Sequence, residues 1–533
     1  MQSGFLAGYA TIAPSHCSAT MRLDPARSPA SAMLAIATAL VTLAFTLGLW
    51  NHGPIPSMET RFAVAVQQML AHHQWLIPEK NGLPYIEYPP FYYWMALVFA
   101  KLGVPVLPAI RLPNLIALWV WIGALYALAR RMLPTLPRWL LPVAVLVAPA
   151  ALYNFFIAQS DAWLCVGVTL ALLGYLRHAE GNGFPRLLWF GTALAVFAKG
   201  PLGLVLVGLA VGLDLLLAAA AATVPWRELP RRIWRLAPFR GVLLAVAPLA
   251  AWYIACGFVA GWDFVRAALV YDNFTRFVAG AGGHANPWWM YAQSFWTDYL
   301  PWSVAVPFGL IMAARRLREP GPRLALAWAV TTLVFFSLSA SKQSKYILPA
   351  APAFAALALI ALGVLTQRRP AWLTRTVAAW SATILLVFVV LVGAWLPQVG
   401  PRIDDDAIYA RLRGTVAAAP GRVTMYRWPR SLILWQLGAP MPWFRDARDL
   451  YGAVHSGRLR SGDYVLVYRD SLSGDGPYAL QPRPAAPYFA HVMTLASKGG
   501  IEVFRVLPEA ASLPLPPTPT PLPTPWWARF DTD

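Results

Sequence analysis

Residues 202–220 read LGLVLVGLAVGLDLLLAAA, a run of almost uninterrupted apolar side chains. About 20 such residues in a helix reach across the hydrocarbon core of a bilayer. Comparable runs recur from Ala32 to about Leu396, and the first of them, residues 32–50, is too long for the core of a signal peptide. The pattern predicts an all-α polytopic membrane protein in which residues 1–31 form a cytoplasmic segment before the first span.

The composition excludes an ordinary water-soluble protein. Of 533 residues, 58% are hydrophobic and 13% are charged, and 25 are tryptophan, so most of the chain must face lipid. The net charge of +19 does not indicate a nucleic-acid partner, because the arginines lie in short loops between apolar runs and form no single basic face.

The apolar runs predict about eleven spans and their orientation. We expect the spans near residues 32–50, 109–129, 139–157, 162–176, 187–198, 202–220, 241–258, 298–314, 324–340, 346–366 and 376–396. With a cytoplasmic N-terminus, the inside loops hold seventeen arginines against three acids. The positive-inside rule therefore predicts a multi-pass protein of a bacterial-type inner membrane, with the C-terminal domain on the periplasmic side.

Two shorter segments should lie on the outer face of the membrane. Residues 91–102 are apolar but short and follow two prolines, which favours a juxtamembrane helix over a span. In residues 59–70, Phe62, Val66 and Met69 share one helical face, which is typical of a helix lying on the membrane surface.

The character of the chain changes after Leu396. We divide it into a transmembrane catalytic domain (32–396), a periplasmic soluble domain (397–511) and a proline-rich disordered tail (512–533). The runs 423–426, 464–468 and 501–506 are short and rich in β-branched or aromatic residues. They predict strands of a small α/β or β-rich domain.

Acids and bases from distant loops should meet on the outer face. In the predicted orientation these residues are Glu59, Arg61, Glu87, Asp161, Lys199, Arg276, His284, Lys342, Lys345 and Tyr346. Ionisable groups at the ends of spans are costly and indicate function, although interfacial lysines can simply extend toward water. Transfer of a sugar from a lipid phosphate needs both kinds of group, because a carboxylate accepts the acceptor's proton while cations hold the phosphate.

Each of these residues also has a structural interpretation. Glu59 could be a helix-start acid, Asp161 could be the N-cap of the following span, and Lys199 before Gly200-Pro201 could be an interfacial lysine in a turn. Glu87 and His284 could bind a divalent metal ion, but two candidate ligands are too few to define a metal site.

The order of the motifs resembles a known family. The motifs are Glu59-Thr60-Arg61-Phe62-Ala63, Leu83 to Trp94, Asp161 after a span, Ala198-Lys199-Gly200-Pro201, Asn273 to Phe277 with His284 and Pro287-Trp288-Trp289, and Ser339 to Lys342 with Lys345 to Pro349. Together they are similar to the GT-C glycosyltransferases of family 39, the protein O-mannosyltransferase and lipid A aminoarabinose transferase type.

The resemblance implies roles for individual residues. It implies that Asp161 is a catalytic acidic residue, that Arg61, Lys199 and Arg276 hold the carrier phosphate, that Tyr85 and Tyr346 line the cavity, and that Glu87 with His284 correspond to a divalent-metal position. Glu59 is the second candidate base and Lys342 a further donor-binding residue. The chain departs from the family at Met58, where an aspartate is usual, and at Tyr88, where the aminoarabinose enzymes commonly have lysine.

The sequence thus predicts a glycosyltransferase that moves a sugar from a polyprenyl-phosphate donor to a periplasmic glycolipid, polysaccharide or protein. Two alternatives remain open. A transporter or flippase for such lipids would also have many spans and intramembrane charges, although no inverted repeat is visible. An inactive GT-C-like binding protein is the second alternative, because the methionine at position 58 cannot accept a proton.

Overall fold

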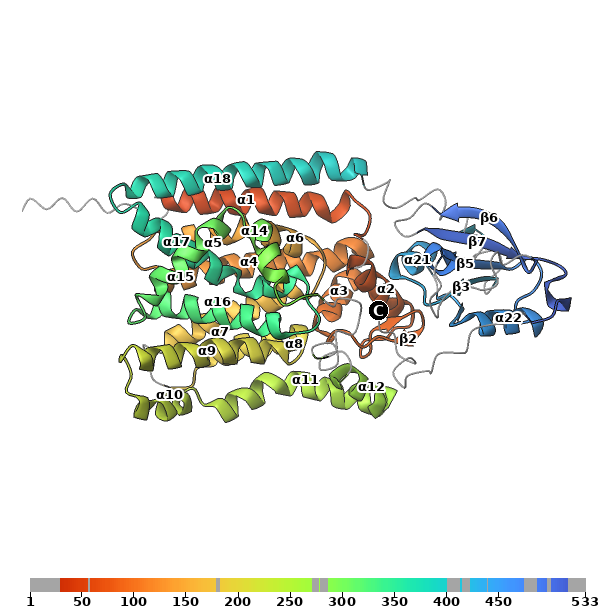
Figure 1. Cartoon of the computed structure of the whole chain (residues 1–533), viewed down its shortest axis with the longest axis horizontal. Helices are drawn as coiled ribbons and strands as arrows, with labels where there is room; N and C mark the ends of the chain where they lie inside the picture. The colour runs from red at the N-terminus through yellow and green to blue at the C-terminus, as the bar shows by residue number, and fades with distance from the viewer. Residues whose placement is uncertain are drawn as a thin grey trace, which may run out of the picture.

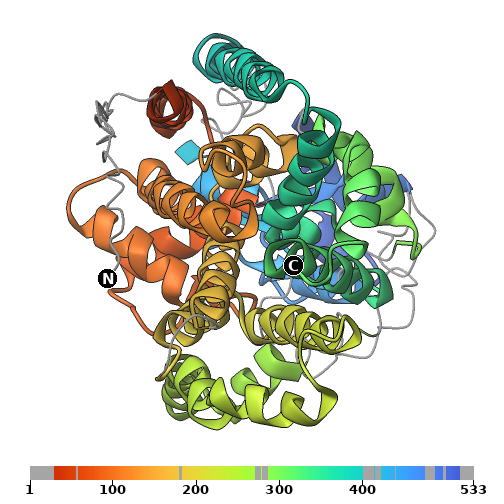
Figure 2. The same ribbon diagram turned by 90° about the vertical axis from the view of Figure 1, so that its left-hand side faces the viewer.

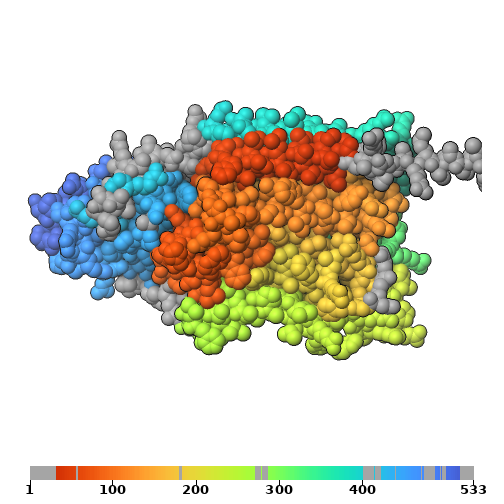
Figure 3. Space-filling view, turned by 180° about the vertical axis from the view of Figure 1, so that it is seen from behind, coloured from red at the N-terminus to blue at the C-terminus, as the bar shows by residue number. Residues whose placement is uncertain are grey.

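The computed structural model describes residues 29–55, 58–178, 183–270, 278, 286–399, 413–414, 422–438, 440–473, 487–495 and 500–515. These residues form a bundle of long helices with a small sheet domain at one end (Figure 1). Seen along the bundle, most of the long helices appear end-on and pack side by side (Figure 2). The first and last long helices lie next to each other along one edge (Figure 3).

The elements of the bundle and its outer loops follow the chain order. They are α1 (Pro29–Trp50), α2 (Met58–Ala71), β1 (Glu79–Lys80), β2 (Leu83–Pro84), α3 (Phe91–Lys101), α4 (Val106–Met132), α5 (Leu140–Leu146), α6 (Pro149–Phe156), α7 (Asp161–His178), α8 (Arg186–Lys199), α9 (Leu202–Ala220), η2 (Trp226–Glu228), α10 (Leu229–Arg235), α11 (Pro238–Ala260), α12 (Trp262–Arg266), α14 (Met290–Asp298), η4 (Trp302–Val304), α15 (Val306–Ala314), α16 (Pro320–Leu338), η5 (Ser344–Ala350), α17 (Ala351–Leu365), α18 (Pro370–Val390) and the π-helical turn η6 (Leu391–Trp395).

The described residues contain seven helices that are long and apolar enough to cross a membrane, which makes the chain a multi-pass membrane protein. These helices include the predicted spans at 32–50, 202–220 and 376–396. The predicted total of eleven spans stays a prediction. Helices α7 and α8, which were predicted as spans, pack within the bundle but are not among the seven.

Two predicted spans are not single helices. Residues 139–157 form α5 and α6, which are separated where Ala148 adopts an extended backbone before Pro149. A residue before proline is biased away from the helical region, and this explains the break. Residues 298–314 are also interrupted, because the short η4 turn that follows Pro301 precedes the nine residues of α15.

Glycines allow α7 and α8 to approach each other at backbone distance. A Cβ atom added at Gly191 would lie 2.3 Å from the backbone nitrogen of Ala171, and one at Gly174 would lie 2.2 Å from that of Leu188. Neither position can hold a larger residue without movement of a helix. Small residues at such contacts are typical of membrane helix packing, where close van der Waals contact replaces the hydrophobic effect.

The predicted surface helix at residues 59–70 is α2, but it does not lie on the surface. Phe62, Val66 and Met69 pack into the core of the bundle, while Val64 packs into a cluster with the sheet domain. Thr60 is also fully buried. Both faces of α2 are covered because the helix lies between the bundle and the C-terminal domain (Figure 1). The short helix predicted at 91–102 is confirmed as α3.

The C-terminal domain is a small α/β domain, as predicted. Its strands β3 (Val423–Tyr426), β4 (Trp443–Phe444), β5 (Tyr464–Tyr468), β6 (Phe489–Leu495) and β7 (Ile501–Val506) have the order β4-β3-β5-β7-β6. Strands β4, β3 and β5 are parallel, whereas β7 is antiparallel to both of its neighbours. Helices α21 (Ser431–Leu437), α22 (Ala447–His455), α23 (Arg469–Ser473) and η7 (Ala510–Ser512) complete it. The proposed domain boundaries themselves stay predictions.

The C-terminal domain is joined to the first loop by a reciprocal pair of hydrogen bonds. The Asn81 side chain donates to the Met441 carbonyl oxygen at 3.0 Å and accepts from the Met441 amide at 2.6 Å. Asn81 is buried and lies in the tight turn between β1 and β2 with φ of 54°. The same turn contacts the second half of α2, where the Gly82 amide donates to the Gln68 side chain, so the contact fixes the sheet domain against the end of the bundle that holds α2.

Candidate functional site

Asp161 and Lys199 form the centre of the candidate site. Asp161 is the first residue of α7, and Lys199 is the last residue of α8, so the antiparallel packing of these helices brings the two side chains together. The Lys199 ammonium donates a hydrogen bond to Oδ1 of Asp161. The other carboxylate oxygen, Oδ2, is buried and accepts no hydrogen bond from the described residues.

A second lysine approaches the same carboxylate. Lys345, from η5, has its Nζ atom 4.0 Å from Oδ2 of Asp161. The same ammonium lies 3.4 Å from Oε1 of Gln159 and 3.4 Å from the sulfur of Met58. Lys199 also lies over the ring of Tyr346, with 5.5 Å between Nζ and the ring centroid.

The Gln159 side chain is held in place from behind. Its amide nitrogen donates to both the carbonyl and the side-chain oxygen of Asn154 at 2.9 Å, and this orientation turns Oε1 toward Lys345. Gln159 is almost fully buried. The position of the Lys345 ammonium is therefore set by buried neutral groups as well as by Asp161.

A further ion pair lies close to the two lysines. Arg61 donates to Oε2 of Glu87 at 2.9 Å, and the Tyr85 hydroxyl donates to the same oxygen at 2.7 Å. The charges of Arg61 and Glu87 act on the Lys345 ammonium, as do those of Asp161 and Lys199. Among the described residues, three cations and two carboxylates thus share one electrostatic environment, and the sum of their charges is one positive charge.

The predicted metal position has a cation beside it. The described residues include no group of three His, Cys, Asp or Glu side chains that could hold a metal ion. The carboxylate of Glu87 contacts the Arg61 guanidinium, an arrangement that suits an ion pair better than a divalent cation. His284 lies outside the residues that the structure describes, as does Arg276.

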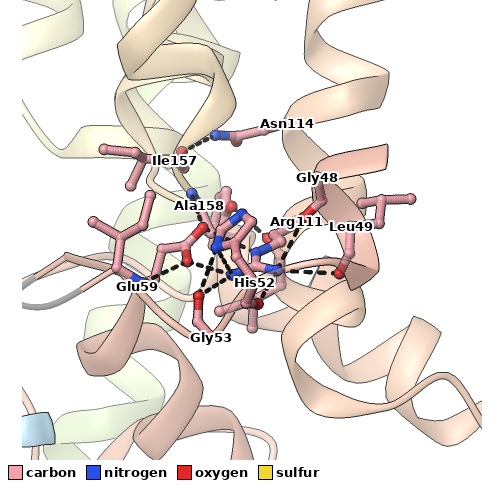
Figure 4. Close-up of polar contacts among 12 residues, drawn as sticks. Gly48, Leu49, His52, Gly53, Glu59, Arg111, Asn114, Ile157 and Ala158 are labelled. Atoms are coloured by element: carbon pink, nitrogen blue, oxygen red, sulfur yellow. Dashed lines mark hydrogen bonds and ion pairs between the residues drawn. The ribbon is translucent and has the colours of Figure 1, made fainter. Parts of the chain in front are cut away.

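Glu59 lies in a closed network (Figure 4). Oε1 accepts from Nε of Arg111 and the amide of Ala158, both at 3.1 Å, and Oε2 accepts from a terminal nitrogen of Arg111 at 2.8 Å and the amide of Ile55 at 2.9 Å. Burial by itself raises the pKa of the Glu59 carboxyl, but the Arg111 guanidinium reverses the effect and holds that pKa below its ordinary value.

Arg111 uses its remaining donors to fix the end of α1. It donates to the carbonyl oxygens of Gly48, Leu49, His52 and Gly53 at 2.9 to 3.2 Å (Figure 4). The carbonyls of Gly48 and Leu49 lie in the last turn of α1 and have no partner within the helix itself. The Glu59–Arg111 pair therefore joins α1, α2 and α4, and each oxygen of Glu59 already accepts two hydrogen bonds from the protein.

Lys342 is also engaged by the protein. Its ammonium donates to the carbonyl oxygens of Asn286, at 3.0 Å, and Ser339. Ser339 is the residue after the last turn of α16, so the lysine satisfies a helix-end carbonyl. Lys342 is 4% exposed, and its position in the fold is that of a helix-capping lysine.

Sequence reasoning missed the structural role of Arg111 and the orienting role of Gln159. Arg111 carried a usable signal, since it is a charge within the apolar run 109–129 and such charges have a specific partner as a rule. The sequence around Gln159 gives no such signal, because a neutral amide next to Ser160 does not indicate a role until the fold brings Lys345 to it.

No protein-family model matches the chain. The chain is 30% identical over 317 residues to an undecaprenyl phosphate-alpha-4-amino-4-deoxy-L-arabinose arabinosyl transferase of Pseudomonas fluorescens strain Pf0-1, covering 57% of this chain and 53% of that protein. A second such transferase, from strain Pf-5, is 26% identical and is covered over 69% of its length, against 75% of this chain. The chain thus spans about half the length of the first relative.

Solved structures share the fold. ArnT from Cupriavidus metallidurans, bound to undecaprenyl phosphate, superposes with a TM-score of 0.69 at 20% identity, covering 90% of this chain and 99% of that one. The oligosaccharyltransferase AglB from Archaeoglobus fulgidus gives a TM-score of 0.55 at 11% identity, covering 83% of this chain and 69% of that one. The resemblance predicted from the motifs is confirmed: the chain is similar to aminoarabinose transferases and has a GT-C glycosyltransferase fold.

Proposed function

We propose that this chain is a membrane glycosyltransferase that moves a sugar from a polyprenyl-phosphate donor to a glycolipid, polysaccharide or protein acceptor. Two relatives are named as undecaprenyl-phosphate aminoarabinose transferases, and one solved structure of the same fold is bound to undecaprenyl phosphate. The lipid bilayer and the donor lipid are its partners. The active end and the C-terminal domain face the periplasm, and this orientation rests on the positive-inside rule.

The single observation that carries the proposal is that two lysine ammonium groups lie beside one carboxylate. Within the part of the chain that the structure describes, Lys199 and Lys345 share one buried carboxylate, Asp161, and the charges of the adjacent Arg61 and Glu87 cancel each other. A partly buried site with unbalanced positive charge favours an anion, and a lysine ammonium binds phosphate as a point charge. The charge on a leaving phosphate grows as the glycosidic bond breaks, so the same cations favour the transition state.

Asp161 is the better candidate for the general base. Its Oδ2 atom accepts no hydrogen bond from the described residues, whereas both oxygens of Glu59 are occupied by four donors. In the proposed reaction the acceptor oxygen attacks the anomeric carbon, its proton passes to Asp161, and the bond to the phosphate breaks with its electron pair leaving on the phosphate. Direct displacement inverts the anomeric configuration.

The other predicted residues take supporting roles in this proposal. Lys199 and Arg61 hold the phosphate, and Tyr85 and Tyr346 line its approach. Arg276, which lies outside the described residues, is a further phosphate-binding residue in this proposal. Lys342 supports the site through the Asn286 and Ser339 carbonyls. A divalent metal ion at Glu87 and His284 remains a separate proposal, which addition of a chelator to the assay would test.

The test measures bond cleavage directly. Purified full-length protein in lipid is supplied with candidate polyprenyl-phosphate sugars and acceptors, and the release of free polyprenyl phosphate is followed. We expect Asp161→Asn to lower the rate by about 10²–10⁴-fold, the usual contribution of a general base. We expect Lys199→Ala to lower it as well, through loss of phosphate binding.

A matched control is Asp214→Asn. Asp214 is also a buried carboxylate, paired with Arg323 and Tyr175, but it lies twelve residues along α9 from Leu202, about 18 Å from the Lys199 end. Unchanged turnover in both site variants would end the assignment of the site. If the lipid crosses the bilayer with its sugar bond intact, the chain is a transporter, and if neither cleavage nor transport occurs, it is a binding protein.

A further inference from the structure

A basic and aromatic segment lies at the end of the bundle opposite the candidate site. It runs from Trp226 to Arg240 through η2, α10 and the start of α11 (Figure 1), and we refer to it as the basic hairpin. It contains five arginines, at positions 227, 231, 232, 235 and 240, and a single acid, Glu228. Neither η2 nor α10 has a buried residue.

Large apolar side chains of the basic hairpin are exposed together with the arginines. Trp226 is 60% exposed, Trp234 68% and Phe239 75%. The rings of Trp234 and Phe239 touch edge to face, with 5.5 Å between their centroids. Tryptophan and phenylalanine exposed beside cations would be unfavourable in water but suit the headgroup level of a bilayer.

The hairpin is held at a fixed position on the bundle. Trp189 of α8 donates its indole N–H to the carbonyl oxygen of Leu236 at 2.7 Å. A Cβ atom at Gly241 would lie 1.7 Å from the Trp189 ring, so the start of α11 rests directly on that ring. Ala237 makes the turn between α10 and α11 with φ of 50°. The exposed side chains of the basic hairpin are therefore presented from a backbone that the bundle holds in place.

Its neighbours place the hairpin at a membrane boundary. The candidate span Leu202–Ala220 ends shortly before it, and the candidate span Pro238–Ala260 begins at its last residues. The rings and guanidinium groups consequently lie where the hydrocarbon region gives way to headgroups. Among the residues that the structure describes, none of the five arginines forms an ion pair.

We infer that the basic hairpin binds acidic phospholipid headgroups of the leaflet opposite the candidate site. An arginine guanidinium matches a phosphate through two parallel hydrogen bonds, and five arginines against one glutamate complement an anionic surface. The exposed rings enter the outer part of the acyl region, while Leu229 and Leu236 pack against the bundle. The occupant is a lipid in the bilayer, because aromatic burial and phosphate recognition occur on one surface.

The inference can be tested by photo-crosslinking in vesicles. Full-length protein is reconstituted with photoactivatable phosphatidylglycerol or with a matched photoactivatable phosphatidylcholine, and adducts are mapped by mass spectrometry to the peptide spanning residues 226–240. We expect about fivefold more adduct on this peptide with phosphatidylglycerol, and a fall in the preference at high salt. The triple variant Arg231→Gln, Arg232→Gln, Arg235→Gln should lose the preference.

The matched control changes Arg315, Arg316 and Arg318 to Gln. These arginines form a cluster in the loop between α15 and α16 with no tryptophan or phenylalanine among residues 315–319. This control should keep the preference of the basic hairpin, and size-exclusion chromatography should show that both variants remain folded. Equal adduct yields from the two lipids, or an unchanged preference in the first variant, would overturn the inference. Abolition of the preference by soluble glycerol phosphate would also overturn it, because the surface would then recognise phosphate without a bilayer.

Discussion

At the residue scale, two buried carboxylates near the same end of the bundle differ in their surroundings. Glu59 has a guanidinium and two backbone amides around it, so all its acceptor positions face protein donors. Asp161 has one close ammonium, a second at 4.0 Å and an oxygen that accepts nothing from the described residues. The first arrangement stabilises a fold, whereas the second is suited to an exchange of protons and ligands.

Replacement of Glu59 by Gln should destabilise the protein. The Arg111 guanidinium would be left in a site where the side-chain exposure of the pair is 3% and 0%, and the expected loss is about 3–5 kcal/mol of unfolding free energy. Because the pKa of Glu59 is lowered in the folded protein, its stabilising contribution is present above the unfolded-state pKa and is lost as the pH falls through the folded-state pKa.

Denaturant unfolding in detergent at neutral and acidic pH measures both effects. The difference between wild type and Glu59→Gln should be largest near neutral pH and should shrink in acid. Glu79→Gln is the control, because Glu79 pairs with the half-exposed His72 and should change stability by at most about 1 kcal/mol. A Glu59→Gln protein as stable as the Glu79→Gln protein would contradict the structural role.

Replacement of Met58 by Asp should weaken donor binding. The Met58 sulfur lies 3.4 Å from the Lys345 ammonium, so a carboxylate there would pair with the lysine and remove the surplus positive charge. We expect KM for the polyprenyl donor to rise about 10- to 100-fold, the equivalent of about 1.5–3 kcal/mol for a hydrogen bond to a charged group. Met58→Leu keeps the site neutral and should leave KM near that of the wild type. Equal KM values in the two variants would show that Lys345 does not hold the phosphate.

At the element scale, the packing of α7 against α8 determines where the site residues meet. Asp161 begins α7 and Lys199 ends α8, so any separation of these helices moves the two charged groups apart. The contact depends on glycines that admit the neighbouring backbone at less than 3 Å from an added Cβ atom. The residues that set the distance between α7 and α8 therefore also set the distance between Asp161 and Lys199.

A single methyl group at Gly191 tests this coupling. Gly191→Ala would bring a Cβ atom within 2.3 Å of the Ala171 nitrogen, and we expect a loss of about 1–3 kcal/mol together with reduced turnover. Thermal unfolding and the release assay measure the two effects. Gly208→Ala is the control, since nothing lies within 4 Å of its Cβ position and the helical propensity of alanine should stabilise it by up to about 1 kcal/mol. Unaltered turnover in Gly191→Ala would show that the site tolerates helix separation.

The elements differ in how far local sequence determines them. Strands β3, β5 and β7 match the predicted runs because β-branched and aromatic residues are concentrated between turn residues there. Helices α5 and α6 were predicted as one span, since hydropathy alone does not register the backbone bias before Pro149. The burial of α2 on both faces depends on the C-terminal domain, and a helical periodicity does not contain that information.

The site was predictable to the extent that topology determined it. The meeting of Asp161, Lys199 and Lys345 follows from placing the three loops that carry them on the same face of the membrane. The difference in role between Glu59 and Asp161 could not be predicted from topology. It depends on Arg111 and two backbone amides that only tertiary packing brings to Glu59.

At the scale of the whole molecule, the C-terminal domain completes the surroundings of the first loop. Its helix α21 packs against α2, and Asn81 exchanges two hydrogen bonds with the backbone of Met441. The residues at the start of α2, Glu59 and Arg61, belong to the two buried ion pairs described above. The sheet domain thus supports the element that carries them.

Asn81→Asp should loosen this domain contact. The Met441 amide keeps an acceptor, but the Met441 carbonyl loses its donor and faces a carboxylate, which costs about 1–3 kcal/mol when buried. Hydrogen exchange should increase in α21 and in residues 79–84, and turnover should fall. Asn51→Asp is the control, because Asn51 donates to the Val392 carbonyl within the bundle and should leave exchange in α21 unchanged. Equal exchange of α21 in both variants would contradict the proposed role of Asn81.

The Asn81 contact has a consequence for biosynthesis. Its two partners are separated by 360 positions in the chain, so a ribosome adds Met441 long after Asn81. During that interval the nascent polypeptide holds its first loop without the surface that covers α2. A truncated chain that stops before α21 would therefore leave one face of α2 uncovered, because Val64 packs against residues of the C-terminal domain.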